Sequence, residues 1–114
     1  MQELTHYING EHVKGTSGRF ADVYNPATGE VQAKVPLASA AEMDIAVQAA
    51  SAAQPAWAAT NPQRRARVMM KFVALLNDNM DRLAEALSRE HGKTLPDAAG
   101  DVQRVLEVVE YCVG

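Results

Sequence analysis

The residues of this 114-residue chain that could carry chemistry are few, and they do not form a known catalytic pattern. Cys112 is the only cysteine and so the only possible thiol nucleophile. Its neighbours Glu110, Tyr111 and Val113 supply neither the positive charge nor the base that activates a thiolate. We therefore expect a buried structural cysteine, and the sequence predicts no catalytic residue in this chain.

Two further patterns suggest ligand sites but lack the required spacing or number of ligands. Gly92-Lys93-Thr94 resembles the end of a phosphate-binding loop, yet the loop's first glycine would stand where Leu87 does, and the triplet follows a helix. No G-x-G-x-x-G dinucleotide fingerprint occurs. His6 and His12 could approach each other in a hairpin, but a metal site needs more ligands. We expect surface histidines, no metal site and no cofactor-binding residue.

Arg104 is the strongest candidate for contact with a ligand. At about 100° per residue it points away from the apolar stripe of its predicted helix. One interpretation is an exposed arginine paired with Asp101 or Glu107, three residues away on either side. The other is a cationic fork that faces a cavity and binds a carboxylate through two parallel hydrogen bonds. Helix geometry alone leaves both interpretations open.

Composition and charge exclude several classes of protein. The net charge is −3, and the one basic cluster, Arg64, Arg65 and Arg67, is typical of a solvated helix face, so we expect no nucleic-acid partner. The N-terminus has no secretory signal and no apolar run reaches transmembrane length, which favours a cytoplasmic protein without a membrane partner. Much of the 47% hydrophobic content is alanine, which buries little area, so the helices need further chain to pack against.

The elements that must position these residues are two hairpins followed by helices, an α+β order. Asn9-Gly10 tolerates the positive φ angles of a type I′ turn within residues 6–13. Residues 20–24 and 31–35 form the second predicted hairpin, joined by a turn containing Pro26 and Gly29. We expect a β-hairpin arm over residues 1–37 and a helical layer over 38–114.

About four amphipathic helices are predicted, and local signals mark most of their ends. The capping box Ser39-x-x-Glu42 begins the first, which Pro55 should end or bend so that Trp57 lies beyond it. Asn61-Pro62 begins the second, as N-cap and first helical residue. The expected apolar stripes of these two helices are Met43, Ala46, Val47, Ala50 and Ala53, and Val68, Met69, Phe72, Val73, Leu76 and Met80.

The last two predicted helices meet at a glycine. Gly92 is a C′ residue that ends the third helix, which carries Leu83, Ala86 and Leu87. The fourth begins near Pro96 and keeps its apolar period to the last residue, so we expect the natural protein to continue. Its stripe is Ala98, Val102, Val105, Leu106, Val109 and Val113.

Short motifs in a fixed order resemble the aldehyde dehydrogenase family over nearly the whole chain. They are Tyr7-Ile8-Asn9-Gly10-Glu11, Asn25-Pro26-Ala27-Thr28-Gly29-Glu30-Val31, Val35-Pro36, Pro55-Ala56-Trp57, Glu90-His91-Gly92-Lys93-Thr94 and Ala99-Gly100-Asp101-Val102. The resemblance covers about the first quarter of the family's chain. It implies that residues 38–114 are one layer of an incomplete α/β NAD-binding domain whose sheet strands come later.

The end of the chain resembles one branch of that family. Gly100-Asp101-Val102-Gln103-Arg104, followed by Val108-Val109-Glu110-Tyr111, is similar to CoA-acylating methylmalonate-semialdehyde dehydrogenase, an enzyme of valine catabolism. The resemblance implies a tetrameric parent that converts malonate or methylmalonate semialdehyde, with NAD and CoA, to acetyl- or propionyl-CoA and carbon dioxide. The catalytic cysteine and principal NAD-binding residues lie outside this segment, so the segment alone should be inactive and bind no cofactor tightly.

The resemblance also assigns individual residues. Arg104 falls on the arginine that holds the substrate carboxylate, while Val105 stands where the family usually has glycine. A monovalent cation would lie between the backbone carbonyls of Val23 and Tyr24 and the side chain of Glu90. Two alternatives stay open: a non-catalytic binding or assembly module, and a non-acylating aldehyde dehydrogenase such as a succinate-semialdehyde type.

Overall fold

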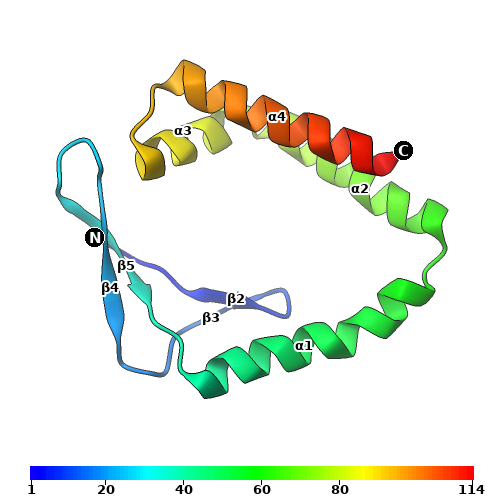
Figure 1. Ribbon diagram of the computed structural model, residues 1–114, viewed down its shortest axis with the longest axis horizontal. Coiled ribbons are helices and arrows are strands. Elements are labelled where there is room, and N and C mark those ends of the chain that lie inside the picture. The colour runs from blue at the N-terminus through cyan, green and yellow to red at the C-terminus, as the bar shows by residue number, and fades with distance from the viewer. The chain divides into compact units, whose positions relative to one another are not determined.

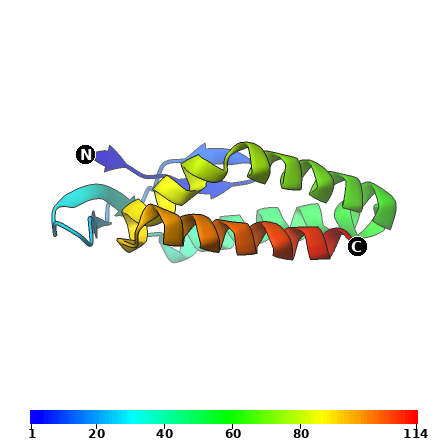
Figure 2. The same ribbon diagram turned by 90° about the horizontal axis from the view of Figure 1, so that it is seen from above.

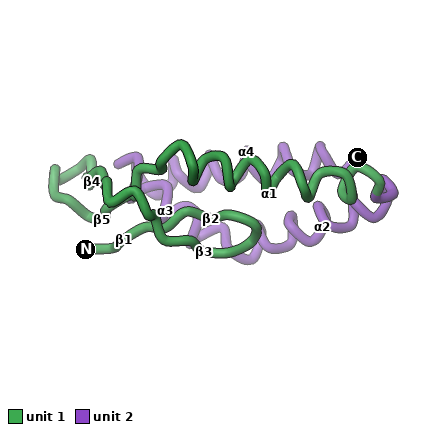
Figure 3. Tube along the Cα trace, turned by 90° about the horizontal axis from the view of Figure 1, so that it is seen from below, with its two compact units in different colours: residues 1–59 green, residues 60–114 purple.

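The computed structural model describes residues 1–114, with all strands in the first third and four helices after them (Figure 1). This order confirms the predicted α+β fold class. The contacts divide the chain into two compact units, residues 1–59 and 60–114, coloured separately in Figure 3. The first helix thus groups with the strands. The division at residue 37, into an arm and a layer of a cofactor domain, stays a prediction about the parent protein.

Both predicted hairpins of the first unit are confirmed. β2 (His6–Ile8) pairs with β3 (Glu11–Val13), and Asn9 and Gly10 between them have φ angles of 53° and 79°. β4 (Phe20–Tyr24) pairs antiparallel with β5 (Val31–Pro36), with a β-bulge between Val23 and Tyr24. The turn residues therefore determine these pairings locally.

A third strand pairing lies outside what the sequence predicts. β1 (Gln2–Glu3) runs parallel to β5, so the strand order of the larger sheet is β1-β5-β4. Gln2 and Glu3 have low strand propensity, and both stay exposed. Backbone hydrogen bonds to β5 therefore hold this segment in the sheet. The pairing continues just beyond β1, where the Leu4 N–H donates to the Lys34 carbonyl at 2.8 Å.

The helix of the first unit is longer than predicted. α1 (Ala40–Ala59) continues through Pro55, so Pro55 does not end the helix, and the prediction that Trp57 lies beyond it is wrong. Proline removes one hydrogen bond, to the carbonyl four residues earlier, while the alanines after it strongly favour helix. Glu42 is the buried residue of α1. The predicted apolar stripe of this helix is not buried in this unit, and its Met43 and Val47 are exposed.

The second unit contains the three other helices: α2 (Pro62–Asp78), α3 (Met80–His91) and α4 (Leu95–Val113). The predicted start of α2 is confirmed, because the Asn61 side chain accepts a hydrogen bond from the Gln63 N–H at 2.8 Å. The predicted end of α3 is confirmed too, since Gly92 has φ 85°. The N-cap of α4 is Thr94, a residue that was not among the predicted caps.

α4 packs against both α2 and α3 (Figures 1 and 2). Leu106 and Val109 meet Leu76 of α2, while Ala98 and Val102 meet Ala84 of α3. Val105 was predicted in this stripe but is 51% exposed, because it lies at the edge of the arc that faces the other helices. No helix in the structure is long and apolar enough to span a bilayer.

Candidate functional site

Arg104 lies on the surface of α4, two turns after the helix begins, and its side chain is 77% exposed. Its Nη1 donates to Asp101 Oδ1 at 3.2 Å, the i,i+3 pairing that the sequence allowed. No second ion pair reaches the guanidinium from its own helix, and Glu107 instead accepts from Gln103 Nε2 at 3.4 Å. The Nε and Nη2 edge of Arg104 is thus available for a second acceptor.

Asp101 has a second cationic partner, eight residues earlier in the chain and outside its own helix. Lys93 Nζ forms an ion pair with Asp101 Oδ2, on the oxygen that Arg104 does not use. The Lys93 hydrogen bond is the main cause of the lowered pKa of Asp101, and burial partly opposes the shift. Asp101 is therefore a carboxylate shared between two cations, one on each oxygen.

The turn between α3 and α4 fixes the backbone of Lys93. Gly92 takes the left-handed conformation and donates its N–H to the Ser88 carbonyl at 2.8 Å. The Ser88 hydroxyl donates to the Lys93 carbonyl at 2.7 Å. Lys93 thus takes part in the helix connection through its carbonyl and in the ion pair with Asp101 through its ammonium group.

The face of α4 that carries Arg104 is open. A Cβ placed on Gly100, one turn before Arg104, would meet nothing within 4 Å. Val108 and Tyr111, which follow on the same face, are among the exposed large hydrophobic residues. The arrangement can hold an anion that also has an apolar part, since exposed hydrophobic side chains follow the cationic fork on one side.

Other residues singled out from the sequence do not form a site. Cys112 is exposed, so the prediction of a buried cysteine is wrong; it lies beside the apolar stripe of α4, not in it. Arg64 and Arg67 are exposed and Arg65 is partly buried. No three His, Cys, Asp or Glu side chains come together as metal ligands anywhere in residues 1–114. The cation site of Glu90 with Val23 and Tyr24 would join the two units and stays a prediction.

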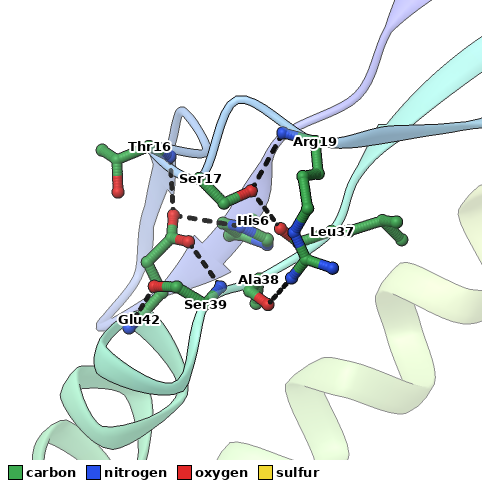
Figure 4. Close-up of polar contacts among 8 residues, drawn as sticks. All are labelled: His6, Thr16, Ser17, Arg19, Leu37, Ala38, Ser39 and Glu42. Atoms are coloured by element: carbon green, nitrogen blue, oxygen red, sulfur yellow. Dashed lines mark hydrogen bonds and ion pairs between the residues drawn. The ribbon is translucent and has the colours of Figure 1, made fainter.

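Glu42 was predicted only as part of a helix cap, but in the structure it also contacts a loop earlier in the chain (Figure 4). Its Oε2 accepts from the Ser39 N–H at 2.8 Å and its own N–H donates to Ser39 Oγ at 3.2 Å, completing the predicted capping box. Its Oε1 also accepts from the Thr16 N–H at 2.7 Å. These backbone donors lower the pKa of Glu42 to about 2.

His6 belongs to the same cluster, so the prediction of a surface histidine is wrong for this residue. Its side chain is 19% exposed, and its Nε2 lies 3.5 Å from Glu42 Oε1 (Figure 4). His12 matches the expectation: it is exposed, and its Nδ1 lies 3.1 Å from Thr5 Oγ1. The two histidines lie on opposite faces of the hairpin. His12 pairs with Tyr7, the strand neighbour of His6, and neighbouring residues of a strand point to opposite faces.

Comparison with known proteins identifies the class. The aldehyde dehydrogenase family matches residues 12–114, and the chain belongs to that family. This confirms the resemblance of the ordered motifs and the interpretation of the fold as a piece of the aldehyde dehydrogenase fold.

The most similar relatives indicate a branch. Malonate-semialdehyde dehydrogenase of Pseudomonas aeruginosa is 51% identical over 97% of this chain and 22% of its own. A Dictyostelium discoideum protein named as an acylating methylmalonate-semialdehyde/malonate-semialdehyde dehydrogenase is 48% identical over 94% and 20%. A Sinorhizobium meliloti crystal structure assigned as methylmalonate-semialdehyde dehydrogenase, complexed with NAD, is 66% identical with a TM-score of 0.96, over 100% and 23%. The chain spans less than a quarter of the length of these three proteins.

Proposed function

We propose that this chain is the N-terminal segment of an NAD-dependent, CoA-acylating dehydrogenase of malonate or methylmalonate semialdehyde. The observation that carries the proposal is the similarity of nearly the whole chain to proteins named as malonate- or methylmalonate-semialdehyde dehydrogenases, one of them named as acylating and another complexed with NAD, at up to 66% identity and a TM-score of 0.96. The segment would supply the helical layer 38–114 of the cofactor domain. We also infer that the parent is a homo-tetramer, as the family resemblance implies.

Within this segment Arg104 would bind the carboxylate of the substrate. A semialdehyde substrate carries a carboxylate near its aldehyde carbon, and a cation that binds this carboxylate fixes the position of the aldehyde. A guanidinium edge binds a carboxylate through two parallel hydrogen bonds. The unpaired Nε and Nη2 edge of Arg104 supports this role. The apolar Val108 beside it would suit the methyl-bearing carbon that distinguishes the two semialdehydes.

The reaction itself would use groups outside this segment. A cysteine thiolate would add to the aldehyde carbon, and loss of a hydride would leave a thioacyl enzyme. NAD supplies the hydride acceptor, and CoA supplies the thiol that releases the acyl group. The thioacyl enzyme would lose its carboxylate as carbon dioxide and take up a proton on the carbon that carried it. Transfer of the remaining acyl group to CoA would return the cysteine and give acetyl-CoA from malonate semialdehyde or propionyl-CoA from the methylated substrate. The segment alone would then be inactive, because its one cysteine, Cys112, has no base beside it.

The test of the function is the full-length enzyme with and without Arg104. We expect Arg104→Ala to lower kcat/KM for malonate semialdehyde by roughly 10- to 150-fold, since a hydrogen bond between charged groups contributes about 1.5–3 kcal/mol. Activity with propanal, which has no carboxylate, should stay within twofold. A loss of less than twofold with malonate semialdehyde would exclude the role of Arg104. CoA-independent turnover would place the enzyme in a non-acylating branch instead.

One observation favours a second candidate, a binding or assembly module without activity. Large apolar side chains of α1 are exposed, among them Met43, Ile45 and Val47. A module should fold by itself, so the isolated chain would unfold cooperatively and elute as one compact species. A segment of a larger domain should show no cooperative transition and should bind an apolar dye, because only seven hydrophobic residues are buried. Circular dichroism and size-exclusion chromatography distinguish the two.

A further inference from the structure

We propose that Asp101, held in place by Lys93, is a positioning residue that aligns Arg104 for the substrate carboxylate. This inference rests on the proposed role of Arg104. Asp101 itself would not touch the substrate. It would hold Nη1 of Arg104 and leave the Nε and Nη2 edge of the guanidinium directed outward.

The geometry supports this division of roles. Asp101 Oδ1 accepts from Arg104 Nη1 at 3.2 Å, while Oδ2 faces Lys93 Nζ. With a different cation on each oxygen, the carboxylate has little freedom to rotate. An arginine on an otherwise open helix face would lose several side-chain rotamers on binding a ligand. A partner that restricts the side chain beforehand removes part of that entropy cost.

The position of Lys93 is itself restricted by the turn before α4. Its backbone carbonyl accepts from Ser88 Oγ at 2.7 Å, and the preceding Gly92 has the left-handed conformation that ends α3. Its side chain is 22% exposed, so the ion pair with Asp101 is partly protected from solvent. The alignment of Arg104 therefore depends on the connection between α3 and α4.

The balance of charge gives Lys93 a second effect. An aspartate beside Arg104 would by itself cancel the positive charge and repel a substrate carboxylate. Because Lys93 neutralises Asp101, the three side chains together carry one net positive charge. Orientation and attraction are then available to the substrate at the same time.

The effect of Asp101→Ala on kcat/KM of the full-length enzyme distinguishes the positioning model from simple charge attraction, because the two predict changes in opposite directions. Loss of alignment should lower kcat/KM for malonate semialdehyde by about two- to fivefold, the range of an exposed ion pair, with kcat little changed. Charge attraction alone predicts a gain, because the site becomes more positive. Glu107→Ala is the matched control: Glu107 is also three residues from Arg104 but makes no ion pair with it. The ratio of kcat/KM for malonate semialdehyde to kcat/KM for propanal should fall in Asp101→Ala and stay constant in Glu107→Ala.

Two further variants keep the test decisive. Asp101→Glu should recover most of the lost kcat/KM, since a glutamate reaches the same partners. Lys93→Gln should weaken use of malonate semialdehyde as well, because Asp101 would then oppose the substrate charge. The positioning role is wrong if Asp101→Ala matches Glu107→Ala or improves kcat/KM. If Arg104→Ala itself leaves the preference for the carboxylate substrate over propanal unchanged, the proposed function of Arg104 has failed rather than the role of Asp101.

Discussion

Glu42 Oε1 lies 2.7 Å from the backbone nitrogen of Thr16, a residue 26 positions earlier in the chain, and accepts its hydrogen bond. Through this contact the first turn of α1 holds the loop that follows the β2–β3 hairpin (Figure 4). The same loop is fixed from its other side, where Arg19 Nη2 donates to the Ala38 carbonyl at 3.1 Å. One carboxylate thus joins a helix cap to the β-hairpin arm.

Replacing Glu42 should loosen the loop at Thr16. In Glu42→Gln only the amide oxygen can accept, so one of the two backbone N–H donors, Ser39 or Thr16, loses its acceptor and the other loses a charged one. The N–H of Thr16 should therefore exchange faster with solvent. Hydrogen exchange of the full-length enzyme, followed by mass spectrometry over peptides covering residues 15–18, measures this. Asp44→Asn, which removes an exposed charge from the same helix, is the control and should leave the loop protected. Equal protection in both variants would contradict the role of Glu42.

The Glu42 contact should also depend on pH in the acid range. The pKa of Glu42 is lowered from 4.5 to about 2, because backbone N–H groups donate to the charged form. A carboxylate with a lowered pKa in the folded state contributes stability that is fully present above its unfolded pKa. That contribution is lost as the pH falls from about 4.5 through 2. As the pH falls through this range, the thermal midpoint of the full-length enzyme should therefore decrease less steeply in Glu42→Gln than in the unsubstituted enzyme. Parallel curves would show that Glu42 contributes nothing to acid sensitivity.

The packing of α4 predicts unequal effects of two similar truncations. Leu106 is 4% exposed and packs on Leu76, so Leu106→Ala should cost roughly 2–5 kcal/mol through lost burial and a cavity. Val108, two residues along and facing outward, should cost less than about 0.5 kcal/mol within this segment when changed to alanine. Thermal unfolding of the full-length enzyme compares them. A larger effect at Val108 would mean that another part of the parent covers this face.

Val105 should have little influence on Arg104 despite its departure from the glycine usual in the family. Its side chain is half-exposed and belongs to neither core cluster of the second unit. Val105→Gly should lower stability by about a few tenths of a kcal/mol, because glycine is the poorer helix former. The KM for malonate semialdehyde should change by less than about twofold on the same reasoning. A larger change in KM, measured beside an unchanged value for propanal, would make Val105 part of the substrate site.

Local features of the sequence predicted most of the secondary structure. The turn at Asn9-Gly10, the capping box of α1, the Asn61 cap and the Gly92 stop all depend on residues within four positions of one another. Such features form from backbone preferences and short-range hydrogen bonds, so they can be predicted from the sequence before the fold is known. Pro55 was predicted to end or bend α1, but the helix continues to Ala59, because the helix propensity of the following alanines outweighs one lost hydrogen bond.

In the candidate site, too, the features set by local sequence were predictable and the contacts between elements were not. The sequence alone determined that Arg104 stands off the apolar stripe of its helix and that Asp101 is within i,i+3 reach, since helix periodicity suffices for both. Only the tertiary structure brought Lys93 to Asp101, Thr16 and His6 to Glu42, and β1 to β5. These pairs depend on how elements pack and where loops return. A single hydrogen bond or ion pair between residues far apart in the chain leaves no periodic signal in the sequence.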